Sequence, residues 1–481
     1  MRISKIKTIL GIGLCATLFM SGCSSDSNDD KIVLPSAPSG GIQQPTYQSL
    51  ELAYNYDLLD SYYFFGHLNN ELGADFTEYQ NAPLQQTYGS SACTVDFTDI
   101  CYMYSRMSDR YTRYYDPNYA AIVLKMATET EESTGAGIAL DIKTTDDAEE
   151  IIVTQVYQNS PAEKAGLRNN DIILDIDGTV PKTLKAAEAL LGGKDGEIIK
   201  VRLYRDGKEQ TIEIQLGTYR MPTVFVSYED SVPVIRISEF TAFTASDSGT
   251  YGEFIAALKK TEGASATIID LRNNPGGDVD QCNNIASELL SAGDTIITDI
   301  EAGTDSLLKD GKWASYQVFD TITYTVLRDG LGKDRYYVFM ADSGSASCAE
   351  VLLSAVTVNK KSPVVGLTTF GKGIGQFVEP TLANGLGIIT AMLSMDKFGQ
   401  IYHKVGIVPD FESGDPDEQM AKAIEWAKDG SIVRKAGYGT ESTGHFAKAR
   451  AIEPEPTAIP ENHKDFLKQV GGKLIFRNIG K

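Results

Sequence analysis

The sequence contains little histidine, tryptophan or cysteine, and its acidic residues far outnumber its basic ones. Its 481 residues include 4 His, 2 Trp and 6 Cys, and 44 Lys and Arg stand against 65 Asp and Glu, a formal net charge of −21. This charge excludes a nucleic-acid binder, and no basic cluster contradicts the exclusion. The cysteine spacing fits no zinc site and phosphate-loop signatures are lacking, so we expect no metal and no other cofactor.

The N-terminus has the pattern of a targeting segment. Three basic residues precede an apolar stretch from Ile9 to Met20, and two small residues follow before Cys23. This ending resembles the bacterial lipobox, which implies a signal peptide over residues 1–22 and a lipid anchor at Cys23. The protein would then be anchored to the outer membrane of a bacterial cell envelope, facing either the periplasm or the outside. The alternatives are an ordinary secretory signal and a short transmembrane anchor.

The rest of the chain divides by pattern into four parts after a polar tether at 23–45. Apolar spacing of three and four predicts helices over 46–130. Short alternating runs predict a β-rich domain over 131–220, and alternating strand-like and helix-like runs predict an α/β core with a largely parallel sheet over 221–430. Residues 431–481 show no pattern that we can assign. The predicted fold class is therefore multidomain, α+β and α/β.

Two stretches of the β-rich part resemble the signature of bacterial PDZ domains: Asn159–Leu167 and the apolar run Asp171–Gly178. PDZ domains bind an extended peptide as an added strand and hold its terminal carboxylate with backbone amides. By resemblance, the carboxylate-binding loop consists of Gly135, Ala136, Gly137 and Ile138. The alternative is a β module that only spaces other domains.

A serine at a strand-to-helix turn is the first candidate for chemistry. The strand-like run ending at Met340 leads through small residues to Ser347 and then into an apolar helix. The first turn of a helix leaves its N–H groups without partners, so amides near Ser347 can hold an oxyanion. Taken alone, such a turn is more often only a capped helix start.

A lysine between glycines is the second candidate. Lys372 follows an apolar stretch and stands between Gly371 and Gly373, which let the backbone approach closely. Burial disfavours an ammonium group, lowers its pKa and supplies a neutral amine that can take a proton from a serine. Most lysines, however, are simply solvated.

Together these segments resemble the motifs of the C-terminal processing peptidases, also called tail-specific proteases. Ser345–Glu350 is similar to their Ser-Ala-Ser-Ala-Ser-Glu motif and Thr369–Gln376 to their Thr-Phe-Gly-Lys-Gly motif. The resemblance implies that Ser347 is the nucleophile, Lys372 the general base and Gln376 the group that orients the lysine. It also implies a ClpP/crotonase-like α/β protease core that cleaves proteins with free C-termini. A homo-oligomer is compatible with it.

A glycine loop completes the resemblance. Asp270–Gly277 matches the family's Asp-Leu-Arg-x-Asn-Pro-Gly-Gly loop, which implies that Gly276 or Gly277 joins the Cys348 amide as the oxyanion hole. The chain departs from the family at Cys348 and Ala349, which replace Ala and Ser.

Other functions remain open at this point. A non-catalytic PDZ adaptor or a ligand-binding protein is the main rival, and hydrolysis of a non-protein acyl compound is another. His403 is the one plausible histidine base, and a thiol protease would pair Cys348 with it. Cys93 and Cys101 lie close enough in sequence for a disulfide, although free buried thiols suit them equally well.

Overall fold

The computed structural model describes residues 47–84, 87–128, 132–144, 149–309, 312–439 and 475–476. The predicted signal peptide, the anchor at Cys23, the tether and most of the C-terminal tail lie outside these residues. No helix in the described part of the chain has the length and apolar character needed to cross a membrane.

A six-stranded sheet forms the centre of the fold, in the order β11-β12-β13-β16-β17-β20. All neighbouring pairs are parallel except β11 with β12. The strands are β11 (Val224–Glu229), β12 (Val232–Ile237), β13 (Ala266–Asp270), β16 (Tyr336–Ala341), β17 (Val364–Gly366) and β20 (Phe411–Glu412). The predicted α/β core with a largely parallel sheet is confirmed.

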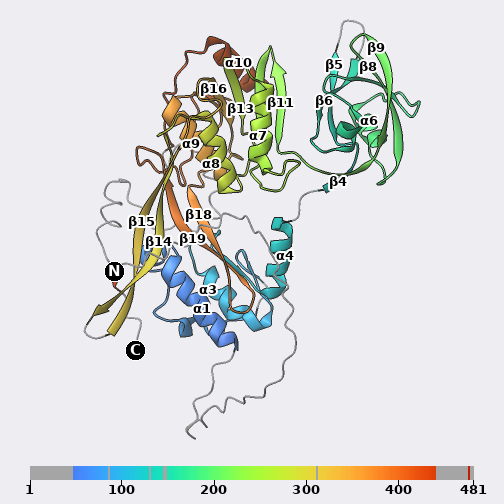
Figure 1. The fold of residues 1–481 in the computed structure, drawn as a ribbon. Coiled ribbons are helices and arrows are strands. Elements are labelled where there is room, and N and C mark those ends of the chain that lie inside the picture. The colour runs from blue at the N-terminus through green and yellow to red at the C-terminus, as the bar shows by residue number, and fades with distance from the viewer. Residues whose placement is uncertain are drawn as a thin grey trace, which may run out of the picture.

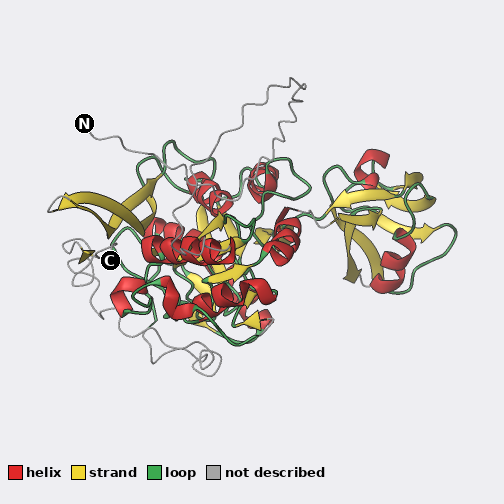
Figure 2. Cartoon of the chain, turned by 90° about the horizontal axis from the view of Figure 1, so that it is seen from below, coloured by secondary structure: helices red, strands yellow, loops and turns green. Residues whose placement is uncertain are grey.

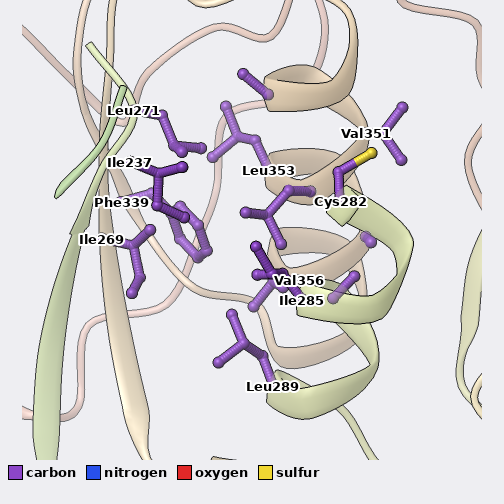
Figure 3. Close-up of a cluster of buried hydrophobic side chains, with 14 of the residues drawn as sticks. Ile237, Ile269, Leu271, Cys282, Ile285, Leu289, Phe339, Val351, Leu353 and Val356 are labelled. Carbon is purple, nitrogen blue, oxygen red and sulfur yellow. The ribbon is translucent and has the colours of Figure 1, made fainter. Parts of the chain in front are cut away.

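Helices cover both faces of this sheet because its strands are apolar on both sides. In β13, Ile269 packs toward one helical layer, whereas Ile268 packs toward the helix on the opposite face. Figure 3 shows the first layer, where Phe339 and Ile269 face Leu353 and Val356. The helices of this layer are α7 (Gly249–Lys260), α8 (Val279–Leu289) and α9 (Cys348–Lys360), and α10 (Pro416–Asp429) lies on the other face.

A second sheet, mostly antiparallel, extends the core and was not predicted. It runs β1-β2-β3-β19-β14-β15-β21, and β18 also pairs with β19. The hairpin of β14 and β15 projects from the body in Figure 1. Its strands are β1 (Thr87–Tyr88), β2 (Ser91–Ala92), β3 (Arg113–Tyr115), β14 (Thr295–Lys309), β15 (Lys312–Thr325), β18 (Ile374–Pro380), β19 (Leu386–Met395) and β21 (Ile475–Phe476).

The N-terminal part is largely helical, as predicted, but it shares its hydrophobic core with this second sheet. Buried residues of the first helices, such as Leu59 and Met103, belong to the same cluster as Ile389 and Leu393 of β19. The helices are α1 (Tyr47–Tyr62), α2 (Gly66–Asn69), α3 (Thr98–Ser105) and α4 (Pro117–Thr128), with 3₁₀ turns at Phe76–Tyr79 and Val95–Phe97. Burial against β19 therefore brings the loop after α3 next to the C-terminal half of the core.

The β-rich part folds as a separate sheet of five antiparallel strands in chain order, and it stands to one side in Figures 1 and 2. Ser160 caps its first helix, Pro161 begins it and Gly166 ends it. The elements are β5 (Ile138–Thr144), β6 (Glu149–Val156), α5 (Pro161–Ala165), β7 (Ile172–Ile176), α6 (Leu184–Leu191), β8 (Ile198–Arg205) and β9 (Lys208–Gln215). The pair β4 (Glu132–Gly135) and β10 (Gly217–Arg220) connects it to the body.

Candidate active site

The turn between β16 and α9 holds Ser347 in an unusual backbone conformation. Ser347 stands directly before the first residue of α9 and has φ 54° and ψ −118°. A positive φ is unfavourable for a residue with a Cβ and costs about 1–3 kcal/mol, so the surrounding structure must enforce it. The turn is held by the buried Ser345, whose hydroxyl donates to the Leu271 carbonyl at 2.8 Å and accepts from the Asp342 amide at 2.9 Å.

A fully buried carboxylate, Glu350, connects the serine turn to the lysine loop. It accepts hydrogen bonds from the amides of Ser347 at 3.0 Å and Lys372 at 2.7 Å. It also accepts from the Gly371 amide at 2.6 Å and the Thr369 hydroxyl at 2.5 Å. Burial raises the pKa of Glu350 to about 7 even though these donors act to lower it. Glu350 therefore fixes the two predicted catalytic residues relative to each other.

Lys372 lies in a setting that weakens its ammonium form. Burial, and secondly the positive charge of Arg113, lower the pKa of Lys372 to about 8, against the opposing negative charges of Asp109 and Glu350. Its Nζ is 4.6 Å from the centre of the Tyr111 ring. A substantial fraction of this lysine is therefore neutral near pH 8, as a general base requires.

The N-terminal part supplies residues around Lys372 that the sequence did not single out. Asp109, Tyr111 and Arg113 follow α3, and Arg113 begins β3, which pairs with β19. Tyr111 packs against the hydrophobic cluster of the N-terminal part and also contacts the Lys372 amine. A dense run of charged and aromatic residues just before a strand is the one signal that could have identified them.

Gln376 is positioned by a cross-strand partner. It lies on β18 directly opposite Thr390 on β19, and its Nε2 donates to the Thr390 hydroxyl at 3.2 Å. The Thr390 hydroxyl in turn donates to Oδ1 of the buried Asp109 at 2.8 Å. The structure thus places Gln376 in a chain of side-chain hydrogen bonds that reaches the N-terminal part.

The glycine loop after β13 lies against the serine turn. A Cβ added to Gly276 would lie 2.7 Å from the Ser347 Cβ and 2.9 Å from the Cys348 nitrogen, so only glycine allows this approach. The Gly276 amide donates to Oδ1 of Asn274 at 2.9 Å, which leaves it unavailable for an oxyanion. The amides of Gly277 and Cys348 find no acceptor within the described residues. Of the two predicted glycines, the geometry therefore favours Gly277.

The sequence suggested two roles for Cys348, as an oxyanion-hole amide and as the nucleophile of a thiol protease. Its sulfur is bonded to Cys282 in the structure. This disulfide joins α8 to the first residue of α9, with the two Cα atoms 5.7 Å apart. A disulfide has no thiolate to act as nucleophile, so the structure contradicts a Cys348–His403 thiol protease. His403 itself stacks on Phe65, with ring centres 6.5 Å apart. The amide of Cys348 remains suited to an oxyanion hole.

A second disulfide joins Cys93 to Cys101, with a Cα separation of 6.1 Å. It closes an eight-residue separation between β2 and α3 in the N-terminal part. The structure therefore selects the disulfide over free thiols for this pair, which the sequence had left undecided.

The predicted carboxylate-binding loop lies between β4 and β5. β5 is an edge strand of its sheet, and α6 packs beside it, which is the arrangement needed for an added peptide strand. The Ala136 amide donates to the Leu191 carbonyl at 3.0 Å, so it holds the loop to α6 and is not free for a ligand. Gly137 has φ 77°, and a Cβ there would lie 2.5 Å from the Ser160 Cβ. The loop therefore requires glycine at this position.

Comparison with known proteins agrees with this architecture. Residues 231–413 match peptidase family S41, and residues 133–216 match the PDZ domain family. The chain has a family S41 peptidase domain and a PDZ domain. The predicted resemblance is thereby confirmed, and the S41 domain contains Ser347, Lys372, Gln376 and the glycine loop. The roles of these individual residues stay predictions.

Curated relatives resemble this chain over about two thirds of its length. The "Probable CtpA-like serine protease" of Staphylococcus haemolyticus (strain JCSC1435) is 29% identical over 341 residues, which are 70% of this chain and 63% of that protein. The "Carboxy-terminal processing protease CtpB" of Bacillus subtilis (strain 168) is 30% identical over 333 residues, 67% of this chain and 64% of that protein. The matches thus span slightly less than two thirds of these relatives.

Among solved structures, a photosystem II D1 C-terminal processing protease aligns over 77% of this chain and 94% of its own length, with 20% identity and a TM-score of 0.44.

Proposed function

We propose that the protein is a serine endopeptidase that recognises substrate C-termini through its PDZ domain. The observation that carries this proposal is the Glu350 carboxylate, which binds the backbone amides of both Ser347 and Lys372. Such a shared anchor pre-organises a nucleophile and a base, which is the arrangement that covalent catalysis requires.

The first half of the reaction forms an acyl-enzyme. The neutral Lys372 amine removes the proton from the Ser347 hydroxyl while the Ser347 oxygen bonds to the scissile carbonyl carbon. The amides of Gly277 and Cys348 donate to the oxyanion that develops on the carbonyl oxygen. The Lys372 ammonium then gives its proton to the leaving nitrogen, and the C–N bond breaks to release the C-terminal fragment.

In the second half, water restores the enzyme. Lys372 takes a proton from the water molecule while the water oxygen attacks the acyl carbon. The Lys372 ammonium then returns that proton to the Ser347 oxygen as the ester bond breaks and the acyl fragment leaves as a carboxylic acid. The PDZ domain contributes by holding the substrate C-terminus as an added strand along β5, so that one chain end stays bound while an internal bond is cleaved.

The test is proteolysis of an unfolded protein, with products identified by mass spectrometry. Wild type should cleave it, Ser347→Ala and Lys372→Ala should not, and substrate with an amidated C-terminus should be cleaved more slowly than substrate with a free one. Ser343→Ala, on the same turn, and Lys259→Ala, on the exposed face of α7, are matched controls that should cleave as wild type does. Equal cleavage by wild type and Ser347→Ala contradicts the proposal.

We also propose that Cys23 anchors the enzyme to the bacterial outer membrane, and the support for this is the sequence pattern of residues 1–22. Intact mass of the protein from a bacterial host should show a lipid-modified N-terminus at Cys23. Cys23→Ser should leave the protein unmodified and release it from the membrane fraction. An unlipidated wild type that starts elsewhere would contradict the anchor.

A further inference from the structure

A series of hydrogen bonds links Gln376 in the S41 domain to the N-terminal part of the molecule, and its second bond joins residues 281 positions apart in sequence. The chain runs from Gln376 Nε2 to the Thr390 hydroxyl at 3.2 Å, and from that hydroxyl to Asp109 Oδ1 at 2.8 Å. Thr390 and Asp109 are both buried, so water does not compete strongly for these bonds.

The direction of each bond in this chain follows from the donor inventory. Asp109 Oδ1 accepts from two backbone amides and is therefore an acceptor, so the Thr390 hydroxyl donates its single proton to it. Its lone pairs are then left to accept, and of the two ends of the Gln376 amide only the NH₂ group can donate to them. The amide nitrogen of Gln376 is therefore fixed toward Thr390, and its carbonyl oxygen takes no part in these bonds.

Asp109 is itself held in place by its own loop. Its Oδ1 also accepts from the amides of Tyr111 and Thr112, both at 2.9 Å, and the Thr112 hydroxyl accepts from the Thr390 amide at 3.0 Å. The same turn thus carries the Tyr111 ring beneath the Lys372 amine and docks on β19 at Thr390. Asp109 Oδ2 is buried and has no hydrogen-bond partner among the described residues, and burial raises the pKa of this carboxyl group. Such a group is costly to bury without a purpose.

We propose that Asp109 and Thr390 are positioning residues that fix the Gln376 amide so that its oxygen, not its nitrogen, is presented to Lys372. The Gln376 oxygen would accept a hydrogen bond from the Lys372 amine and so direct the lone pair of the lysine nitrogen toward Ser347. A flipped amide would present a donor and repel the lysine protons. This inference rests on the proposed function, in which Lys372 is the base.

The N-terminal part is thereby assigned a task in the peptidase reaction. It sets the orientation of a side chain that lies in another part of the sequence, as the third member of a triad does for a histidine base. Loss of these hydrogen bonds should lower turnover and leave substrate affinity nearly unchanged. Neither Asp109 nor Thr390 needs to touch the substrate.

The experiment compares Thr390→Val with Thr390→Ser in the full chain. Valine keeps the shape and removes the hydroxyl, so kcat should fall about 10- to 100-fold, the usual effect of losing an outer partner, with KM within twofold. Serine keeps the hydroxyl, so kcat should remain within about threefold of wild type. Thr267→Val is the matched control, since Thr267 is fully buried and its hydroxyl has no partner among the described residues.

A second pair of variants tests the other end of the chain, and it also serves if Thr390→Val folds poorly. Asp109→Ala should lower kcat as Thr390→Val does, whereas Asp109→Asn retains an Oδ1 acceptor and should restore most of it. Asp109 also raises the pKa of Lys372, so its removal changes the fraction of neutral lysine near pH 8. The assays are therefore run at pH 9, where most of Lys372 is already neutral in the wild type.

The outcomes separate this inference from the proposed function. Wild-type turnover that depends on Ser347, together with equal kcat for Thr390→Val and Thr390→Ser, overturns the positioning role and leaves the peptidase intact. A wild type without Ser347-dependent cleavage overturns both. A kcat loss confined to Thr390→Val and Asp109→Ala, with normal KM and thermal unfolding, supports the inference.

Discussion

The two halves of the active site are built in different ways. The nucleophile half consists of the glycine loop after β13 and the turn before α9, which are held together by bonds such as that from the Ala346 amide to the Asn274 carbonyl at 2.9 Å. The base half combines Lys372 with Asp109, Tyr111 and Arg113 from the N-terminal part. In the proposed mechanism the S41 domain provides the reacting groups, and residues of the N-terminal part act on the pKa of one of them, Lys372.

The largest effect is expected from Lys372→Met, which removes the proposed base. The rate of peptide cleavage should fall about 10⁴-fold, the upper end of what general-base catalysis contributes. Steady-state assays on a quenched peptide measure this, and Lys259→Met is the surface control. A loss below tenfold would mean that another group takes the serine proton.

The same variant should also be more stable at neutral pH. The folded-state pKa of Lys372, about 8, lies below its ordinary value of 10.5, so burial of this lysine destabilises the fold below pH 8 and ceases to do so above 10.5. Lys372→Met should gain about 2 to 3 kcal/mol at pH 7, and the gain should disappear as pH rises through this window. Urea unfolding at pH 7 and pH 10 measures it; a pH-independent difference contradicts the lowered pKa.

Each half has its own disulfide, and the two should differ in their effect on stability. The Cys282–Cys348 bridge spans 66 positions, so replacing both cysteines by alanine should cost about 4 kcal/mol, against about 2.5 kcal/mol for Cys93–Cys101, which spans eight. Chemical unfolding of the two double variants measures the difference. Only the first should also lower kcat strongly, since Cys348 follows the nucleophile; equal kcat losses would contradict this division.

A substitution in the glycine loop probes the nucleophile half alone. Gly276→Ala places a Cβ against Ser347 and should lower kcat about 10²- to 10³-fold, as loss of an oxyanion donor does. Gly263→Ala is the matched control, because Gly263 also has a positive φ, 89° against 100°, but faces open space. Both variants bear similar backbone strain. Similar kcat values for the two would show that the loop does not shape the oxyanion hole.

The smallest effect should come from Arg113→Met, which changes only the electrostatics of the base half. The positive charge of Arg113 lowers the pKa of Lys372, so its removal should raise that pKa and move the rising limb of the pH–rate profile to higher pH. The maximal rate at high pH should be retained. A shift toward lower pH, or none, would show that Arg113 does not act on Lys372.

The nucleophile half was predictable because it consists of two segments, each of which is a continuous motif in the sequence. Helix-like runs predicted within 221–430 correspond to α7, α8 and α9, and the motif at 345–350 marks the turn directly. The environment of Lys372 was not predictable. β1, β2 and β3 are two or three residues long, too short to show a period, and they form because the edge of β19 is available for pairing. The pairing of Gln376 with Thr390, and of Thr390 with Asp109, leaves no spacing signal in the sequence.

The central claim is that a neutral Lys372 activates Ser347, and the pH dependence of kcat/KM for the wild type tests it most directly. This profile reports the free enzyme's essential groups. The account predicts a rate that rises with pH to a plateau, with an apparent pKa of about 8. A rising limb centred near the ordinary histidine value of about 6.5 would contradict it and indicate a histidine base such as His403.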